Sequence, residues 1–94
     1  MKVSNMTSSK GNKVANQFII TDEVDHDTHT HERLVFQSYS TVIAIKCDGK
    51  IILDNNWDYS KTTGKYRNQF LSETKKETER KIKDGTYHIT NLNK

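Results

Sequence analysis

Two stretches carry the residues best suited to chemistry, DHDTHTHE at 25–32 and WDYSKTTGKYRNQFL at 57–71. In the first, His29 and His31 are two residues apart, so an extended backbone places both imidazoles on one face beside carboxylates. Imidazole with carboxylate is a ligand set for Zn²⁺, Ni²⁺ or Cu²⁺. The run contains no apolar residue to hold such ligands in place, so we expect only weak, incidental metal binding and no cofactor. A metal-dependent enzyme is the least favoured of three functional hypotheses.

The second stretch combines aromatic and basic residues at the start of an expected helix. Asp58 or Ser60 can cap that helix by accepting a hydrogen bond from a free backbone N–H. Trp and Tyr are enriched at binding hot spots because each has an apolar body and a polar tip. The basic side chains of the first turns are expected to point away from the apolar side of the helix, while Tyr66 and Phe70 build the core. For Trp57 and Tyr59 the core remains an open alternative to a binding surface. The predicted partner-binding residues are Trp57, Tyr59, Lys61, Lys65 and Arg67.

Acid–base catalysis has a weaker basis in the sequence. Asp54, Asp58 and His88 could meet where the expected hairpin, helix start and last strand converge, but the carboxylates are equally suited to turns and caps. Neither a nucleophile elbow nor a phosphate-binding glycine loop is present. The single cysteine, Cys47, lies in an alternating strand pattern and is expected to be a structural thiol. We therefore expect a protein without catalytic activity.

Positive charge is concentrated near the C-terminus. Residues 60–83 carry eight Lys or Arg against three Glu, or 8 − 3 = +5, whereas the whole chain carries +3. A basic helix face can follow a phosphate backbone, so nucleic-acid binding is the second functional hypothesis. The acidic residues interleaved on the same helix are more typical of a solvated face, and no known nucleic-acid motif is present. The candidate contacts are Lys75, Lys76, Arg80 and Lys83.

Hydrophobic periodicity predicts an α+β fold, with a small antiparallel sheet of about four to five strands packed against one main helix at about 60–83. The expected strands are 14–23, 33–40, 41–48, 50–54 and 86–92. Asp48-Gly49 separates two of them and predicts a two-residue hairpin turn. Gly85 should end the helix, and Ser72 could divide it. An Asn-Gln-Phe triplet occurs at 16–18 and again at 68–70, which leaves a helix open as the alternative for residues 11–20.

Composition predicts a single domain over residues 1–94, with a flexible arm at about 1–13. The acidic, His-rich segment at about 22–32 is expected to be a loop or the tip of a long hairpin. Only 32% of residues are hydrophobic, so the core must be small, and a homodimer or another bound partner would add apolar burial. No apolar run has the length of a membrane helix or a signal peptide. We expect a cytoplasmic protein without membrane association.

The central part of the chain, about 36 residues, resembles a family of short, mostly uncharacterised proteins of bacteriophages and related mobile elements. The matching residues are Phe36, Ser38, Tyr39, Thr41, Ile43, Ala44, Leu53, Asp54, Trp57, Asp58, Tyr59, Ser60, Thr62, Thr63, Tyr66, Phe70 and Leu71. The resemblance implies an accessory protein made in an infected bacterial cell, and it supplies no mechanism. Together with the aromatic residues, it favours a protein that binds a host or phage protein and modulates it, in an anti-defence or regulatory role.

Overall fold

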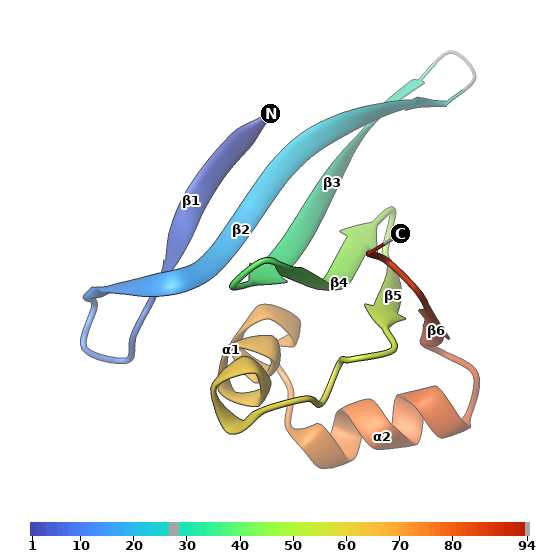
Figure 1. Ribbon diagram of the computed structural model, residues 1–94. Helices are drawn as coiled ribbons and strands as arrows, with labels where there is room; N and C mark the ends of the chain where they lie inside the picture. Colours follow the sequence, from blue (N-terminus) through green and yellow to red (C-terminus); the bar gives the residue numbers. More distant parts are fainter. Residues whose placement is uncertain (27–28, 94) are drawn as a thin grey trace.

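The computed structural model describes residues 1–26 and 29–93, with the backbone alone described at 24–26 and 29. The described residues form a mixed six-stranded sheet and two helices, which confirms the α+β class (Figure 1). In chain order the elements are β1 (Lys2–Thr7), β2 (Lys13–His26), β3 (His29–Ser38), β4 (Thr41–Cys47), β5 (Lys50–Asp54), α1 (Lys61–Leu71), α2 (Lys75–Lys83) and β6 (His88–Thr90). None of the described helices is long and apolar enough to cross a membrane.

The order of strands in the sheet is the order of strands in the chain, from β1 to β6. Strands β1 to β5 pair antiparallel with their neighbours. Asp48 and Gly49 join β4 to β5 with φ of 53° and 74°, the two positive values that a tight hairpin turn requires. The predicted hairpin is confirmed. Residues 13–26 are extended in β2, so the helical alternative for 11–20 is wrong.

The N-terminal segment is not the flexible arm that the sequence analysis expected at 1–13. Lys2–Thr7 is β1, an edge strand, and Asn5 Nδ2 donates to the carbonyl of Val14 at 3.0 Å. Met6 is buried and packs into the core. Most side chains of β1 are exposed and few are hydrophobic. The sequence of this segment therefore lacks the alternating hydrophobic pattern that would have predicted a strand.

Strands β2 and β3 continue into the segment at 22–32, so of the two alternatives for it, a loop or the end of a long hairpin, the described residues form the hairpin. Residues 22–26 and 29–32 are paired strand residues, and the hairpin extends beyond the helices (Figure 1). Residues 27 and 28 lie outside the described residues. Asp22 pairs directly with Arg33 across the two strands, and their side chains form an ion pair at 2.6 Å. The sequence of this segment is mostly acidic residues, histidine and threonine, so it lacks the period-two hydrophobic pattern that marks a half-buried strand.

The helical segment expected at about 60–83 is confirmed in part: it forms two helices, because Ser72 divides it, as the sequence left open. Ser72 has φ 55° and ψ 45°, a left-handed conformation that ends α1, and its N–H caps the helix. Thr74 starts α2 with a capping box: its hydroxyl accepts from the N–H of Glu77, whose carboxylate accepts from the N–H of Thr74. Gly85, with φ 86°, follows the last turn of α2, as predicted.

A row of directly paired residues forms the floor of the hydrophobic core. The row runs through Ile19, Phe36, Ala44 and Leu53. Helix α1 covers it, and the rings of Phe36 and Phe70 lie 5.7 Å apart. Tyr66 and Phe70 are both buried in this core, as expected.

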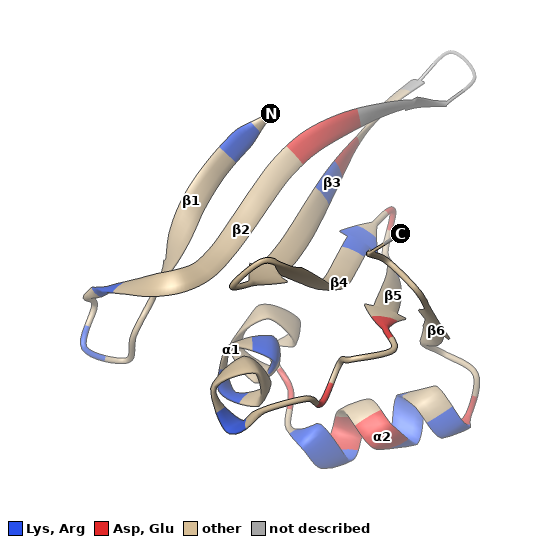
Figure 2. Ribbon diagram, viewed as in Figure 1, with Lys and Arg blue, Asp and Glu red and all other residues tan. Residues whose placement is uncertain are grey.

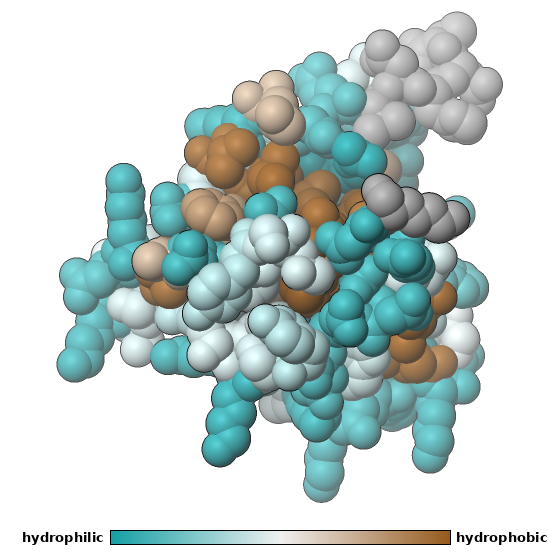
Figure 3. Space-filling model, viewed as in Figure 1, coloured by the Kyte–Doolittle hydropathy of each residue, from teal (hydrophilic) through white to brown (hydrophobic). Residues whose placement is uncertain are grey.

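The opposite face of the sheet carries a second apolar row, because paired residues one position along the strands point the other way. This row is Val3, Ile20, Val35, Ile45 and Ile52. Val35 is buried outside the core cluster. Both helices lie on one side of the sheet (Figure 1), and hydrophobic side chains are open to view over β1 to β3 above them (Figure 3). The helices therefore close the core on one face only.

Strand β6 is parallel to β5, which corrects the expected all-antiparallel sheet. Helices α1 and α2 form the crossover that a parallel pair needs. Asp54, at the end of β5, is buried and accepts hydrogen bonds from the N–H groups of Leu92 (2.7 Å) and Asn56 (2.9 Å). Burial alone would raise the pKa of Asp54, but these hydrogen bonds outweigh it and lower the pKa below its ordinary value. Asp54 thus holds the C-terminal segment against the sheet.

Candidate functional site

Trp57 is held in place by Arg67, which comes from α1. The guanidinium carbon of Arg67 lies 5.0 Å from the Trp57 ring centroid, and Nη1 donates to the Trp57 carbonyl at 2.9 Å. Arg67 is only 1% exposed. The expectation that Arg67 points outward to a partner is therefore wrong: its charge is satisfied within the fold by Trp57, by Asp58 at 3.3 Å and by Asn68 at 2.9 Å.

A groove of about 580 Å³ lies between Trp57 and the outward face of α2, and we call it the Trp57–α2 groove. Its lining residues are Trp57, Lys76, Glu79, Arg80, Ile82 and Lys83. Trp57 and Ile82 are partly buried against the core and supply the apolar part of the groove. Within the described part of the chain, Lys76, Arg80 and Lys83 form no ion pair, so their charges are available to a partner.

A second concavity, of about 620 Å³, lies along α1, and we call it the α1 depression. Its lining residues are Asp58, Ser60, Lys61, Gly64, Lys65, Arg67, Asn68 and Lys75. Asp58 forms ion pairs with Lys75 at 2.7 Å and with Arg67 at 3.3 Å. The hydrogen bond from Lys75 is the main reason that the pKa of Asp58 lies below its ordinary value. The same contact raises the pKa of Lys75.

Each of the two concavities is lined by residues from both predicted sets, the protein-binding set and the nucleic-acid set. Trp57, from the predicted protein-binding set, lines one groove with Lys76, Arg80 and Lys83 from the predicted nucleic-acid set. Conversely, Lys75 joins Lys61, Lys65 and the buried Arg67 in the other. Tyr59 is 58% exposed and lines neither concavity. Figure 2 shows the basic residues of both helices at one end of the molecule, away from the acidic residues near the tip of β2 and β3.

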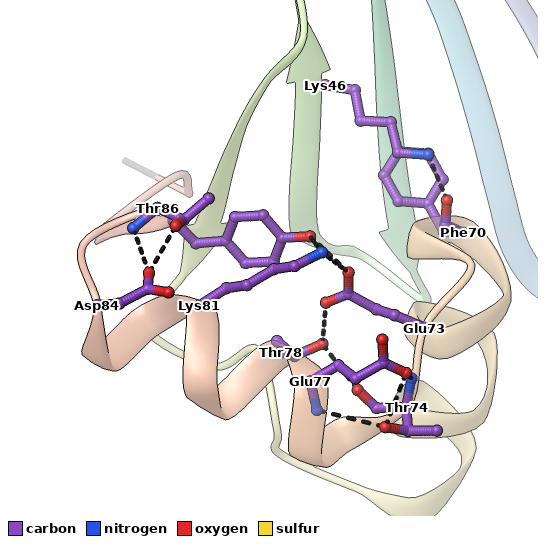
Figure 4. Close-up of polar contacts among 10 residues, drawn as sticks. Lys46, Phe70, Glu73, Thr74, Glu77, Thr78, Lys81, Asp84 and Thr86 are labelled. Atoms are coloured by element: carbon purple, nitrogen blue, oxygen red, sulfur yellow. Dashed lines mark hydrogen bonds and ion pairs between the residues drawn. The ribbon is translucent and has the colours of Figure 1, made fainter.

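A buried polar network, which the sequence analysis missed, fixes α2 to the turn before it and to the segment that leads into β6 (Figure 4). The Glu73 carboxylate accepts from the Tyr87 hydroxyl at 2.6 Å, from Lys81 Nζ at 2.8 Å and from the Thr78 hydroxyl at 2.6 Å. Burial alone would raise the pKa of Glu73, but the three donors lower it. Burial and the neighbouring Glu73 carboxylate raise the pKa of Tyr87. The Thr-x-x-Glu spacing at 74–77 would have located the start of α2 and so the turn that carries Glu73.

The histidine-rich segment shows a local role for one of its two candidate metal ligands. His31 Nδ1 lies 2.8 Å from Asp48 Oδ1, so His31 contacts the turn between β4 and β5. The side chain of His29 lies outside the described residues. Among the residues that are described, no group of three or more His, Cys, Asp or Glu side chains could hold a metal ion.

The three residues considered for acid–base chemistry do not form one site. Asp54 is occupied by backbone N–H groups, and Asp58 by Lys75 and Arg67. Across the described residues, no hydrogen bond joins either carboxylate to His88, which is exposed on β6. These carboxylates act as a strand-end anchor and as an ion-pair partner.

Comparison with known proteins identifies a family but no activity. No curated protein and no solved structure matches the chain. The sequence model of a family of unknown function, DUF8033, matches residues 1–85, which include both concavities and all elements except β6. The chain therefore belongs to the DUF8033 family.

Proposed function

We propose that this chain is a non-enzymatic accessory protein of a bacteriophage or related mobile element, which binds a host or phage protein and modulates it. The Trp57–α2 groove is the observation that supports this most directly. It places a partly buried tryptophan and an isoleucine beside three cations that have no internal ion pair among the described residues. An anchored aromatic with a charged rim is the composition typical of a protein-binding hot spot.

The anchoring of Trp57 favours this use of the groove. Arg67 contacts both the ring and the carbonyl of Trp57, so the indole is positioned before any partner arrives. Preorganisation lowers the entropy that must be lost on binding. The cations at the rim favour an acidic partner and faster association at low salt.

Nucleic-acid binding is the second candidate, and the same groove is the reason. Unpaired cations beside an indole can contact phosphates and stack with an unpaired base. Glu79 lies among those cations and opposes a polyanion, so we rank this candidate second.

Capture from host-cell extract, with and without nuclease, tests the proposal. We expect Trp57→Ala to abolish capture in the nuclease-treated sample. Joint replacement of Lys76, Arg80 and Lys83 by Gln should mainly slow association at low salt. The matched control replaces three exposed cations near the opposite end of the chain, Lys2, Lys10 and Lys13, by Gln, and it should behave as wild type.

Melting curves must accompany each variant, because Trp57 packs against the core. The protein-binding proposal fails if a folded Trp57→Ala variant captures its partner fully. Binding that nuclease abolishes, and that only the α2 triple variant loses, would establish the nucleic-acid candidate instead.

A further inference from the structure

One face of α1 carries residues that destabilise a helix. Lys61, Gly64, Lys65 and Asn68 are spaced at i, i+3, i+4 and i+7, so they lie along one side of the helix. Lys61 occupies the first turn, where the helix dipole disfavours a cation, and no acidic residue in that turn offsets it. Lys61 and Lys65 repel each other across one turn. A glycine within a helix costs about a further 1 kcal/mol relative to alanine.

Neither backbone conformation nor space explains Gly64. Its φ is not positive, unlike those of Gly11, Gly49 and Gly85. A Cβ at this position would meet nothing closer than Arg67 Nη2 at 3.6 Å, which is an ordinary contact. Gly64 and Arg67 both line the α1 depression, so the missing side chain leaves room beside the buried guanidinium.

Arg67 also has unused donors. A guanidinium has five N–H groups, and described hydrogen bonds account for three of them, to Trp57, Asp58 and Asn68. Nε is buried and has no partner among the described residues. The remaining N–H groups are on Nε and Nη2, the neighbouring nitrogens that bind oxyanions in a bidentate manner. Arg67 is therefore a buried cation with two N–H groups that could still donate to an anion.

We propose that the α1 depression binds a phosphate group carried by a small molecule. Four cations and one carboxylate line it, for a net charge of 4 − 1 = +3. A bound dianion would offset each unfavourable feature of this site: the first-turn lysine, the lysine pair and the buried guanidinium with unused donors. The concavity of about 620 Å³ is within the range of small-ligand sites.

Titration of the folded protein with inorganic phosphate, followed by the backbone NMR signals of residues 60–68, tests this site. Chloride at matched ionic strength is the reference. We expect saturable shifts that strengthen as pH rises and phosphate passes from the monoanion to the dianion. Lys61→Gln with Lys65→Gln should weaken binding at least about tenfold, as loss of charge-assisted contacts predicts.

Gly64→Ala tests the site more directly. It places a methyl group beside the Arg67 guanidinium, and alanine has a higher helix propensity than glycine. Binding should weaken about tenfold with no fall in melting temperature. The matched control, Lys76→Gln with Lys83→Gln, makes the same charge change in the other groove and should alter affinity less than about twofold. The proposal would be overturned if the two double-lysine variants lost phosphate affinity equally. It would also be overturned if Gly64→Ala bound phosphate as tightly as the wild type.

The source of the phosphate is distinguished by two further probes, a nucleoside monophosphate and a short oligonucleotide. Saturable binding of the monophosphate, at least as tight as that of inorganic phosphate, is expected. Binding of the oligonucleotide alone, with steep salt dependence, would refute a small-molecule site. The site shares no lining residue with the Trp57–α2 groove, so its failure would leave the proposed protein partner untouched.

Discussion

Glu73→Gln should destabilise the protein more than any other single charge removal on α2 or the turn before it. The substitution keeps the size of the side chain but removes the charge that three donors share. A hydrogen bond to a charged group contributes about 1.5–3 kcal/mol. Lys81 remains 32% exposed and can regain water, so the cost should stay below the ~3–5 kcal/mol of breaking a fully buried pair. We expect a loss of about 2–3 kcal/mol at pH 7.

Thermal and urea denaturation measure that loss. For a chain of this size it corresponds to a fall in melting temperature of about 10–20 °C. The matched control is Glu79→Gln on the outward face of α2, which should change stability by less than about 0.5 kcal/mol. In Glu73→Gln the pKa of Tyr87 should also fall toward its ordinary value, which ultraviolet titration of the phenol would show.

The stability that Glu73 contributes should depend on pH in a defined direction. The folded pKa of Glu73 is lowered, so its contribution is present above the unfolded pKa and is lost as pH falls through the folded pKa. The glutamine variant does not titrate at this position, and the stability gap between the two proteins should therefore narrow below about pH 4. A gap under about 0.5 kcal/mol at pH 7, or one that stays constant down to pH 3, would refute the reasoning.

Three further outcomes follow from the described contacts. Ser72→Gly should stabilise the protein by about 0.5–1 kcal/mol in denaturant titrations, because glycine adopts the left-handed conformation without strain; a loss of stability would contradict this. Asp54→Asn should cost about 1–3 kcal/mol and speed hydrogen exchange at the Leu92 amide, whereas unchanged exchange would show that Asp54 does not hold the C-terminal segment. Zn²⁺ or Ni²⁺ should leave the melting temperature unchanged; a rise that disappears in the His29→Ala/His31→Ala double variant would reverse the metal prediction.

Parts of the fold with a strong local signal could be predicted from the sequence. Asp48-Gly49 specifies its turn because few residue pairs tolerate two positive φ values. The spacing of Tyr66 and Phe70 marks the buried side of α1. By contrast, β1 owes its place to pairing with β2, and its own side chains are mostly exposed. Ser72 breaks the helix with a residue type that does not by itself prescribe a left-handed conformation.

The candidate sites depended on tertiary contacts that sequence spacing does not contain. Arg67 looks like Lys61 and Lys65 in sequence, yet its burial depends on the Trp57 carbonyl from the preceding loop. The sequence also did not show that Lys75 lies in a different concavity from Lys76, Arg80 and Lys83. This separation depends on Asp58, which lies outside α2 and forms an ion pair with Lys75. Residue type alone therefore could not predict which of the candidate side chains lie together in the folded protein.

The sheet topology has a consequence for the order of folding. Strands β1 to β5 pair only with sequence neighbours, which closes short loops and favours rapid formation. Strand β6 must wait for both helices before it meets β5, and it adds only three residues, all exposed. We therefore expect β6 to join last during folding and to open first in native-state hydrogen exchange. During synthesis, the five-strand meander would then emerge and begin to pair before the segment that completes the sheet has been translated.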